Sequence, residues 1–210
     1  MINDPSKIEA LADRILAAPF SGRRRLVAIA GAPASGKSTL AEEIVAHLNA
    51  SGQVSQVVPM DGFHLDNEIL KNKGILDRKG SPASFDADGF VRLIAAFETE
   101  DQVYYPLFDR GRDIAIAGAG CVDESCETVV VEGNYLLLDE APWSKLSEFW
   151  EYSVWVDVSI EILKARLLQR WLDHGLSERE ALDRITGNDL PNAEIAVSNS
   201  LPVDEIIRFD

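Results

Sequence analysis

Short apolar runs alternate along this chain with stretches in which apolar residues recur every three or four positions. A continuous apolar run is typical of a strand buried on both faces, and the longer spacing is typical of a helix with one buried face. The runs predict strands at 26–30, 54–58, 128–131, 153–158 and 205–209. The periodic stretches predict helices near 37–50, 66–73, 86–99, 159–174 and 177–186. This alternation predicts an α/β fold with helices on both faces of a parallel sheet.

Two further segments add to this pattern. Asp4 and Pro5 fit the N-cap and first turn of an opening helix. Its predicted buried face carries Ile8, Leu11, Ile15 and Leu16. Between 103 and 121, two β-type runs at 103–107 and 112–117 flank a polar turn and predict a small hairpin added to the core. No repeat or linker interrupts the chain, so we expect one domain over 1–210.

Residues 31–38 match the pattern G-x-x-x-x-G-K-[ST] directly after the first predicted strand. Glycines let successive backbone N–H groups face phosphates, Lys37 reaches the outer phosphates, and the Ser38 hydroxyl can ligate magnesium. The helix that begins here adds the positive end of its dipole. The loop therefore predicts a nucleotide-binding protein, and the alternative is an ordinary glycine-rich turn.

Composition and charge narrow the range of partners. The chain has 210 residues, is 46% hydrophobic and carries a formal net charge of -15. Nucleic acids and anionic membranes call for a basic face, so neither is an expected partner. We see no signal peptide and no apolar stretch long enough to span a membrane, which favours a cytoplasmic protein. Cys121 and Cys126 lack a matching His or Cys pair, so a zinc site is not expected.

Two carboxylates follow predicted strands. Asp61 comes after the second strand and Glu132 ends the third long one, at the sheet edge where ligands bind in such folds. Asp61 can accept a proton from an attacking hydroxyl or help hold magnesium. Glu132 fits a Walker-B acid on magnesium. The alternatives are a turn cap for Asp61 and a solvent-exposed strand end for Glu132.

Other motifs separate the nucleotide-binding classes. The N-K-x-D motif of GTPases is incomplete, since 72–75 lacks the acid, and the L-S-G-G-Q signature of transport ATPases is absent. Phosphoryl transfer needs cations around the moving charge. Three clusters offer them: Arg78 with Lys79, Arg110 with Arg112, and Arg166 with Arg170, the last pair on one helical face. The alternative for a charged helical face is plain solvation.

The motifs also occur in a characteristic order. They are GAPASGKST at 31–39, MDGFH at 60–64, RKGSPASFD at 78–86, YYPLFDR at 104–110 and VVEGNY at 130–135. Together they resemble the phosphoribulokinase/uridine kinase family of P-loop kinases over nearly the whole chain. The resemblance is strongest to the pantothenate-kinase-like branch, which includes proteins named fructose transport system kinases. It implies a five-stranded parallel sheet in the order 2-3-1-4-5.

The resemblance also implies a role for individual residues. ATP phosphates would lie on Gly31, Ala32, Ala34, Ser35, Gly36, Lys37, Ser38 and Thr39, with Asn188 and Asn192 in a nucleotide-side turn. Asp61 would be the catalytic base, and magnesium would be held by Ser38, Glu132 and Asp61. Lys37, Arg166 and Arg170 would offset charge on the transferred phosphoryl group, the arginines coming from a lid segment at about 166–192. The acceptor pocket would contain His64, Arg78, Lys79, Tyr105, Arg110 and Asn134.

We therefore expect a kinase that uses ATP and Mg²⁺ to phosphorylate a hydroxyl of a small metabolite, with a sugar such as fructose as one candidate. A pantothenate or nucleoside kinase is the alternative among enzymes. Residues 62–64 do not match the uridine kinase acceptor motif, and pantothenate kinases proper carry an additional regulatory region. An ATP-dependent switch or accessory protein is the alternative from another class. The sequence leaves the acceptor open, and also the choice between a monomer and a homo-oligomer.

Overall fold

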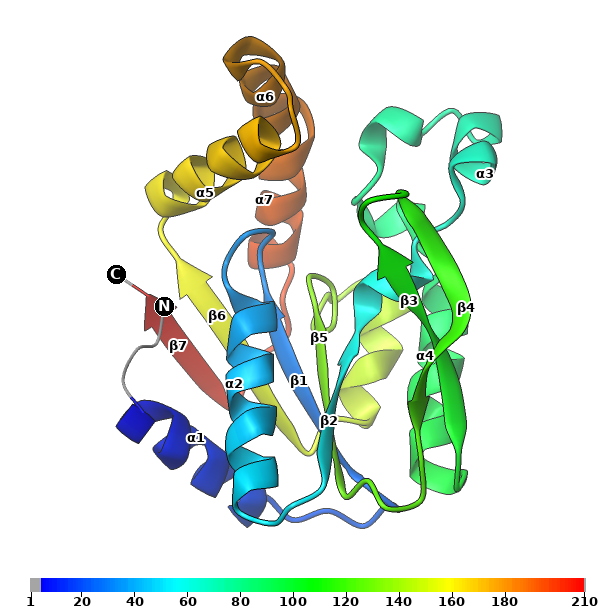
Figure 1. The fold of residues 1–210 in the computed structure, drawn as a ribbon, viewed down its shortest axis with the longest axis vertical. Helices are drawn as coiled ribbons and strands as arrows, with labels where there is room; N and C mark the ends of the chain where they lie inside the picture. Colours follow the sequence, from blue (N-terminus) through cyan, green and yellow to red (C-terminus); the bar gives the residue numbers. More distant parts are fainter. Residues whose placement is uncertain (1–4, 210) are drawn as a thin grey trace.

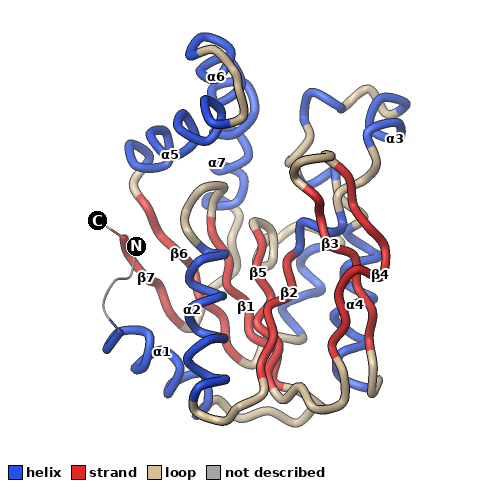
Figure 2. The backbone as a smooth tube through the Cα atoms, viewed as in Figure 1, coloured by secondary structure: helices blue, strands red, loops and turns tan. Residues whose placement is uncertain are grey.

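A computed structural model of the chain describes residues 5–209. Its centre is a five-stranded parallel sheet in the order β2-β5-β1-β6-β7, covered by helices on both faces (Figure 1). Counted along the chain within this sheet alone, that order is 2-3-1-4-5, as expected. The two-stranded antiparallel hairpin β3-β4 lies beside the sheet (Figure 2). The fold predicted from the sequence is thus confirmed.

The strands lie close to their predicted positions. Those of the main sheet are β1 (Arg25–Gly31), β2 (Ser55–Pro59), β5 (Thr128–Gly133), β6 (Tyr152–Val158) and β7 (Glu205–Phe209). The hairpin is formed by β3 (Val103–Asp109) and β4 (Ile114–Val122). Its second strand starts two residues later than predicted and runs further, to Val122. Every residue of β1 and β5 is buried, which explains their uninterrupted apolar runs.

The helices are α1 (Pro5–Ala17), α2 (Lys37–Ala50), α3 (Asn67–Asn72), α4 (Ala87–Thr99), α5 (Ile160–Asp173), α6 (Glu178–Arg184) and α7 (Leu190–Ser198). Side-chain N-caps fix the starts of four of them, from Asp66, Asp86, Ser159 and Ser177. The predicted cap at Asp4 lies outside the described residues.

The end of α6 differs from expectation. The segment 187–192 was predicted as a turn, but a π-helix, Ile185–Asp189, continues α6 directly into α7. Pro191 is the second residue of α7 and directly follows the π-helix, whose altered hydrogen-bond spacing accommodates it. The turn prediction is therefore wrong, because Gly187 and Pro191 are compatible with a helix at these two places.

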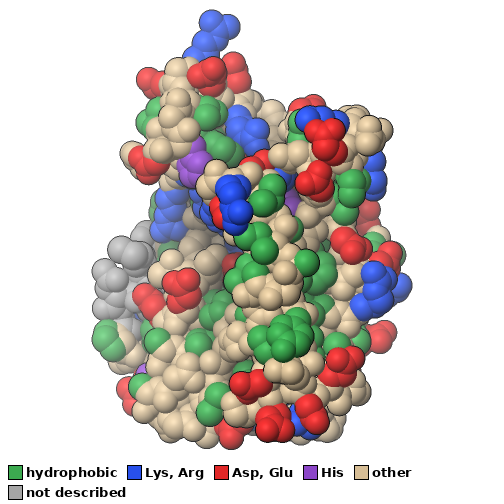
Figure 3. Space-filling model, turned by 45° about the vertical axis from the view of Figure 1, so that its right-hand side comes forward, with side chains coloured by type: hydrophobic (Ala, Val, Ile, Leu, Met, Phe, Trp, Pro, Cys, Tyr) green, Lys and Arg blue, Asp and Glu red, His purple; other side chains and the backbone are tan. Residues whose placement is uncertain are grey.

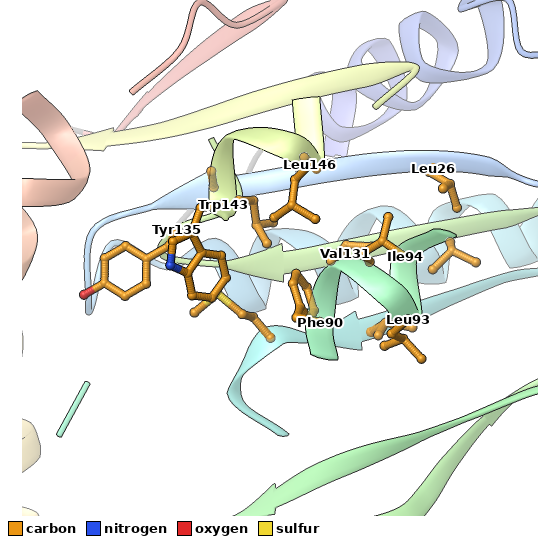
Figure 4. Packing of buried hydrophobic residues seen from close by; sticks show 14 of the residues in the cluster. Leu26, Phe90, Leu93, Ile94, Val131, Tyr135, Trp143 and Leu146 are labelled. Carbon is orange, nitrogen blue, oxygen red and sulfur yellow. The ribbon is translucent and has the colours of Figure 1, made fainter. Parts of the chain in front are cut away.

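The sheet divides the core into two layers. Alternate residues of β1 point to opposite faces: Val27 and Ile29 pack with α1 and α2, whereas Leu26, Ala28 and Ala30 pack on the other face. That second face is covered by α4 and by the segment 135–146, whose aromatic and aliphatic side chains interlock there (Figure 4). The labelled members are Leu26, Phe90, Leu93, Ile94, Val131, Tyr135, Trp143 and Leu146. The core fixes the strand ends that carry the site.

The two thiols differ in environment, which gives a first prediction. Cys126 is 5% exposed, and burial raises its pKa to about 11, whereas Cys121 on β4 is half-buried. At pH 8 only about one Cys126 in a thousand is a thiolate, the reactive form. We expect a thiol reagent to label Cys121 within minutes and Cys126 only after unfolding. Rapid labelling of Cys126 in folded Cys121→Ser protein would contradict this packing.

In residues 5–209, no helix is long and apolar enough to cross a membrane.

Candidate active site

Three strands of the sheet end together at the site. In the parallel register, Pro59 of β2 lies opposite Glu132 of β5, which in turn lies opposite Ile29 of β1. Asp61 follows β2 in a tight 3-10 turn, Met60–Phe63. A Cβ on Gly133 would lie 2.6 Å from the Met60 Cβ, so only glycine lets the two acid-bearing segments approach this closely. The fold thus brings Asp61 and Glu132 to the end of β1, where the phosphate loop begins.

The phosphate loop leaves the N-terminus of α2 open. Gly36 has φ 100°, in the left-handed region that favours glycine, and no side chain caps the helix that starts at Lys37. The first backbone N–H groups of a helix have no partners within it, so here they are available to an anion. They border a cavity of about 310 Å³. Its lining includes Ala34, Ser35, Gly36, Lys37, Ser38 and Thr39.

Two of the predicted loop residues have a packing role instead. Ala32 is buried against Leu163 and Ala193 and does not line the cavity. A Cβ on Gly31 would lie 2.7 Å from the Ser35 hydroxyl oxygen and 3.0 Å from the Val156 carbonyl oxygen. These residues hold the loop close to the sheet and to helices α5 and α7.

Lys37 and the two acids form a compact charged group. The Lys37 Nζ lies 3.7 Å from Glu132 Oε2, and Asp61 forms an ion pair with Arg110. Burial works to raise the pKa of Asp61, but the charges of Lys37 and Arg110 outweigh it and hold that pKa below its ordinary value. Burial raises the pKa of Glu132, and Lys37 offsets only part of the effect. Asp61 is therefore ionised at neutral pH.

The same group fits a magnesium ion. Ser38 and Glu132 both line the cleft, and the Ser38 hydroxyl works to lower the pKa of Glu132, so hydroxyl and carboxylate lie together beside the loop. Mg²⁺ is commonly held by one or two carboxylates together with substrate phosphates and waters, rather than by a full protein cage. Within residues 5–209 no cluster of three or more His, Cys, Asp or Glu side chains could hold a metal alone.

Helix α5 lies above the phosphate loop (Figure 1). Arg166 Nη1 donates to the Ser35 carbonyl at 2.8 Å and to the Ala34 carbonyl at 3.1 Å. Arg166 and Arg170 both line the phosphate-loop cavity, one helical turn apart. The structure thus brings this predicted pair to the loop, from the lid segment (residues 166–192).

A second, larger cleft of about 920 Å³ adjoins the loop. Asp61, Glu132 and Ser38 lie on its floor, and its walls come from the hairpin and the lid segment, where basic side chains gather (Figure 3). Ser38 and Arg170 line both cavities, so the two cavities meet at the charged group. This cleft is the candidate acceptor site.

Of the six predicted acceptor residues, Lys79 and Arg110 line this cleft. The Lys79 ammonium already has three acceptors: Asn67 Oδ1 at 2.7 Å, Asp113 Oδ1 at 2.9 Å and the Asp113 carbonyl at 3.1 Å. Its three N–H donors are thereby occupied. Lys79 therefore joins the hairpin tip to α3, whereas the Arg110 side chain is 63% exposed.

Tyr105, expected in the acceptor pocket, lines neither cavity, because that side chain packs in the core. It is 3% exposed, and its hydroxyl accepts from Gln56 at 2.7 Å and donates to the Val57 carbonyl at 3.3 Å. The apolar-polar alternation of β3 turns Tyr105 inward and leaves Tyr104 exposed. Tyr105 fastens the hairpin to β2.

His64 also lies outside the cleft lining. Its ring centroid is 4.0 Å from that of Phe85 and 4.8 Å from that of Phe108, and its Nδ1 lies 2.8 Å from the Asp61 carbonyl oxygen. Burial lowers the His64 pKa. This histidine supports the turn that carries Asp61.

Arg78, Asn188 and Asn192 connect the lid segment to the loop 78–80. Arg78 donates to the Gly187 carbonyl at 2.7 Å and to Asn192 Oδ1 at 3.2 Å, and Asn188 donates to the Lys79 carbonyl at 2.9 Å. The two asparagines are 4% and 1% exposed. They line neither cavity, contrary to their expected place beside the nucleotide.

Asn134 lines neither cavity, and its Oδ1 is buried without a hydrogen-bond partner within residues 5–209. Several lining residues were not predicted from the sequence. In the cleft they are Glu42, Pro59, Asn67, Leu76, Leu107, Phe108, Asp113, Trp171, His174, Leu176 and Arg184. The signal that could have found Arg184 was its position on the helical lid segment, 14 residues after Arg170.

Gly62 gives a second prediction about how the site is built. A Cβ there would lie 2.0 Å from the Pro106 carbonyl oxygen of β3, which is backbone and cannot turn aside. We expect Gly62→Ala to lower the free energy of unfolding by about 1–3 kcal/mol and to displace Asp61. Gly22→Ala is the control, because its nearest neighbour would be 3.6 Å away. Equal denaturant midpoints for the two variants would contradict this close approach.

Comparisons with known proteins agree with the geometry. A family described as an AAA domain matches residues 27–184. A solved structure from Silicibacter sp. TM1040, provisionally named a fructose transport system kinase, superimposes with a TM-score of 0.92 at 48% identity, over 95% of this chain and 98% of that one. A provisionally named uridine kinase of Schizosaccharomyces pombe is 30% identical over 98% of this chain and 92% of its own length.

A pantothenate kinase of Listeria monocytogenes is 29% identical over 79% of this chain, which spans 54% of that protein. The relatives therefore share a nucleotide-binding core and a kinase name, while the acceptors in their names differ.

Proposed function

Because the chain belongs to the phosphoribulokinase/uridine kinase family of P-loop kinases and is an ATP-dependent small-molecule kinase, we propose a division of labour between its two cavities. ATP binds with its phosphates in the phosphate-loop cavity, and the acceptor binds in the cleft. The hydroxyl of the acceptor meets the γ-phosphoryl group at the junction formed by Ser38 and Arg170. The observation that carries this proposal is that Asp61 and Glu132 lie on the cleft floor, beside Ser38.

In this mechanism Asp61 accepts the proton of the attacking hydroxyl. Its lowered pKa keeps it ionised at neutral pH, so the acceptor meets a carboxylate rather than an acid. Lys37 and the arginines of the lid segment offset the charge that spreads over the transferred group. Ser38 and Glu132 would hold magnesium, with Asp61 beside them. When bound, the metal would neutralise phosphate charge and orient the phosphates.

In this proposal Arg110 first pairs with Asp61 and then contacts the acceptor. It forms an ion pair with Asp61, yet its side chain remains largely exposed on the cleft wall. An acceptor entering the cleft can therefore take over this guanidinium and leave the Asp61 carboxylate free for the hydroxyl. The lid segment excludes water when it closes over both substrates.

For the acceptor, a sugar such as fructose is the first candidate, supported by the name of the 48%-identical relative. Pantothenate and a nucleoside are the alternatives, supported by the names of the other relatives. An ATP-dependent switch or accessory role is disfavoured by a cleft of about 920 Å³ whose floor carries a carboxylate suited to deprotonating a hydroxyl.

The test is ADP release with ATP and Mg²⁺ across hexoses, pentoses, pantothenate and nucleosides. Stimulation by one acceptor, lost on removal of Mg²⁺ with a chelator, is the expected result. Slow ADP release that ignores every acceptor would instead support the switch or accessory role.

A further inference from the structure

Three arginines of the lid segment are distributed over the two cavities in sequence order. Arg166 lines only the phosphate-loop cavity, Arg170 lines both cavities, and Arg184 lines only the cleft. The first two account for the cations that a transferred phosphoryl group needs. Arg184 faces the acceptor side, where the mechanism above gives it no part.

Arg184 is held in place by an aromatic ring rather than by a carboxylate. Its Cζ lies 4.3 Å from the centroid of the Trp171 ring. The indole Nε1 in turn donates to Asp189 Oδ2 at 2.6 Å, and Asp189 is buried at the end of the π-helix. Because the guanidinium is stacked on an anchored ring, the Arg184 side chain has little conformational entropy left to lose. Binding of a ligand to it therefore carries only a small entropic cost.

Two of the other cations that line the cleft differ from Arg184, and the third, Arg170, is placed by the proposed function on the transferred phosphoryl group. Lys79 is paired with Asp113, and Arg110 is paired with Asp61. Within residues 5–209 the Arg184 side chain makes no hydrogen bond or ion pair, and its Nε is buried without a partner. Asp189 attracts it through space, but that carboxylate accepts its hydrogen bond from Trp171. Arg184 thus presents unused N–H donors on a cleft wall of a chain with net charge -15.

A guanidinium offers donors in a planar fork that matches a carboxylate or a phosphate. We propose that the acceptor carries such an anionic group and that Arg184 binds it while the hydroxyl of the acceptor faces Asp61. This inference rests on the proposed function. A neutral acceptor would leave the guanidinium without a partner in a closed cleft, which costs free energy.

The first test compares acceptors in pairs that differ in the anionic group. The pairs are fructose and its monophosphate esters, pantothenol and pantothenate, glycerol and glycerate, and uridine and its monophosphate. We expect ADP release to be stimulated by an anionic member, with kcat/KM about 10- to 100-fold above that of its neutral counterpart.

A preference for neutral members would overturn this inference and leave the proposed function standing. ADP release that ignores every acceptor would overturn the proposed function, and this inference would fall with it.

The second test uses the acceptor found in the first. Arg184→Gln is expected to raise its KM about 10- to 100-fold, with kcat and the KM for ATP little changed. Arg184→Lys should restore part of the affinity, because it keeps the charge without the fork. Arg179→Gln is the matched control, since Arg179 is an exposed arginine of the same helix.

Thermal unfolding and ATP affinity, measured for Arg184→Gln, show whether the variant has lost acceptor binding or has lost its folded structure. If Arg184→Gln weakens ATP and acceptor equally, or leaves the acceptor KM unchanged, Arg184 is only a packing residue and the inference fails.

Discussion

Asp61→Asn should lower kcat by about 10²- to 10⁴-fold, the usual contribution of a positioned general base. The substitution keeps the size of the side chain but removes its capacity to take a proton. The amide can still contact Arg110, so the cleft should keep its shape. ATP affinity should change little, because Asp61 lies in the cleft and does not line the phosphate-loop cavity. Steady-state kinetics with the acceptor and a direct ATP-binding measurement check both expectations.

The control for this variant is Asp77→Asn, an exposed carboxylate in the nearby turn Leu76–Arg78. A second control addresses the other role open to Asp61, as a magnesium ligand. If Asp61 mainly holds the metal, raising the Mg²⁺ concentration should restore much of the lost rate, whereas a missing base cannot be replaced that way. Near-normal turnover of Asp61→Asn would contradict both roles.

Lys37→Met should lower kcat/KM for ATP by about 10²- to 10³-fold, as the loss of a donor aimed at developing charge does in other enzymes. Lys37 lies at the start of α2 and lines the phosphate-loop cavity, with Nζ 3.7 Å from Glu132. Its loss removes a cation from the phosphates and also leaves Glu132 buried without its partner. The raised pKa of Glu132 should then rise further, which favours its neutral form.

Lys37→Arg should not restore full activity, because a planar fork differs in shape from a compact ammonium. Lys164→Met, an exposed lysine of α5, is the matched control. Wild-type kinetics for Lys37→Met would show that the phosphates do not lie in this cavity.

Local patterns were sufficient to predict the main sheet. Strands β1 and β5 are wholly buried, so their residues form uninterrupted apolar runs that few other structures explain. The sequence also located the two acids, since a carboxylate directly after such a run must lie at the edge where parallel strands end. The strand order was available only through the resemblance to a family.

The predictions differed from the structure at residue types that are compatible with two different structural environments. Gly187 and Pro191 usually end a helix, but here one lies in a π-helix and the other in the first turn of α7. Tyr105 matched an acceptor motif, yet its inward position in β3 makes it part of the core. Tertiary packing decides which of the two environments such a residue occupies, and local patterns in a single sequence do not show that packing.

The walls of the cleft were the least predictable part of the site. Lys79 and Asp113 meet across 34 positions of sequence, and Trp171 and Asp189 meet across 18. Such pairs have no periodicity that would reveal them before the fold is known. For the same reason, Arg184 could be recognised as a candidate acceptor-binding residue only once the fold had placed it in the lining of the cleft.

The central claim is that the two cavities transfer the γ-phosphoryl group to a metabolite hydroxyl. The most direct test incubates the protein with γ-labelled ATP, Mg²⁺ and the acceptor panel, and identifies the labelled product by mass spectrometry. The account predicts that the label appears as a phosphate ester on one metabolite hydroxyl, and that Asp61→Asn slows its appearance about 10²- to 10⁴-fold. Label found only in inorganic phosphate, at a rate that no acceptor changes, would contradict it.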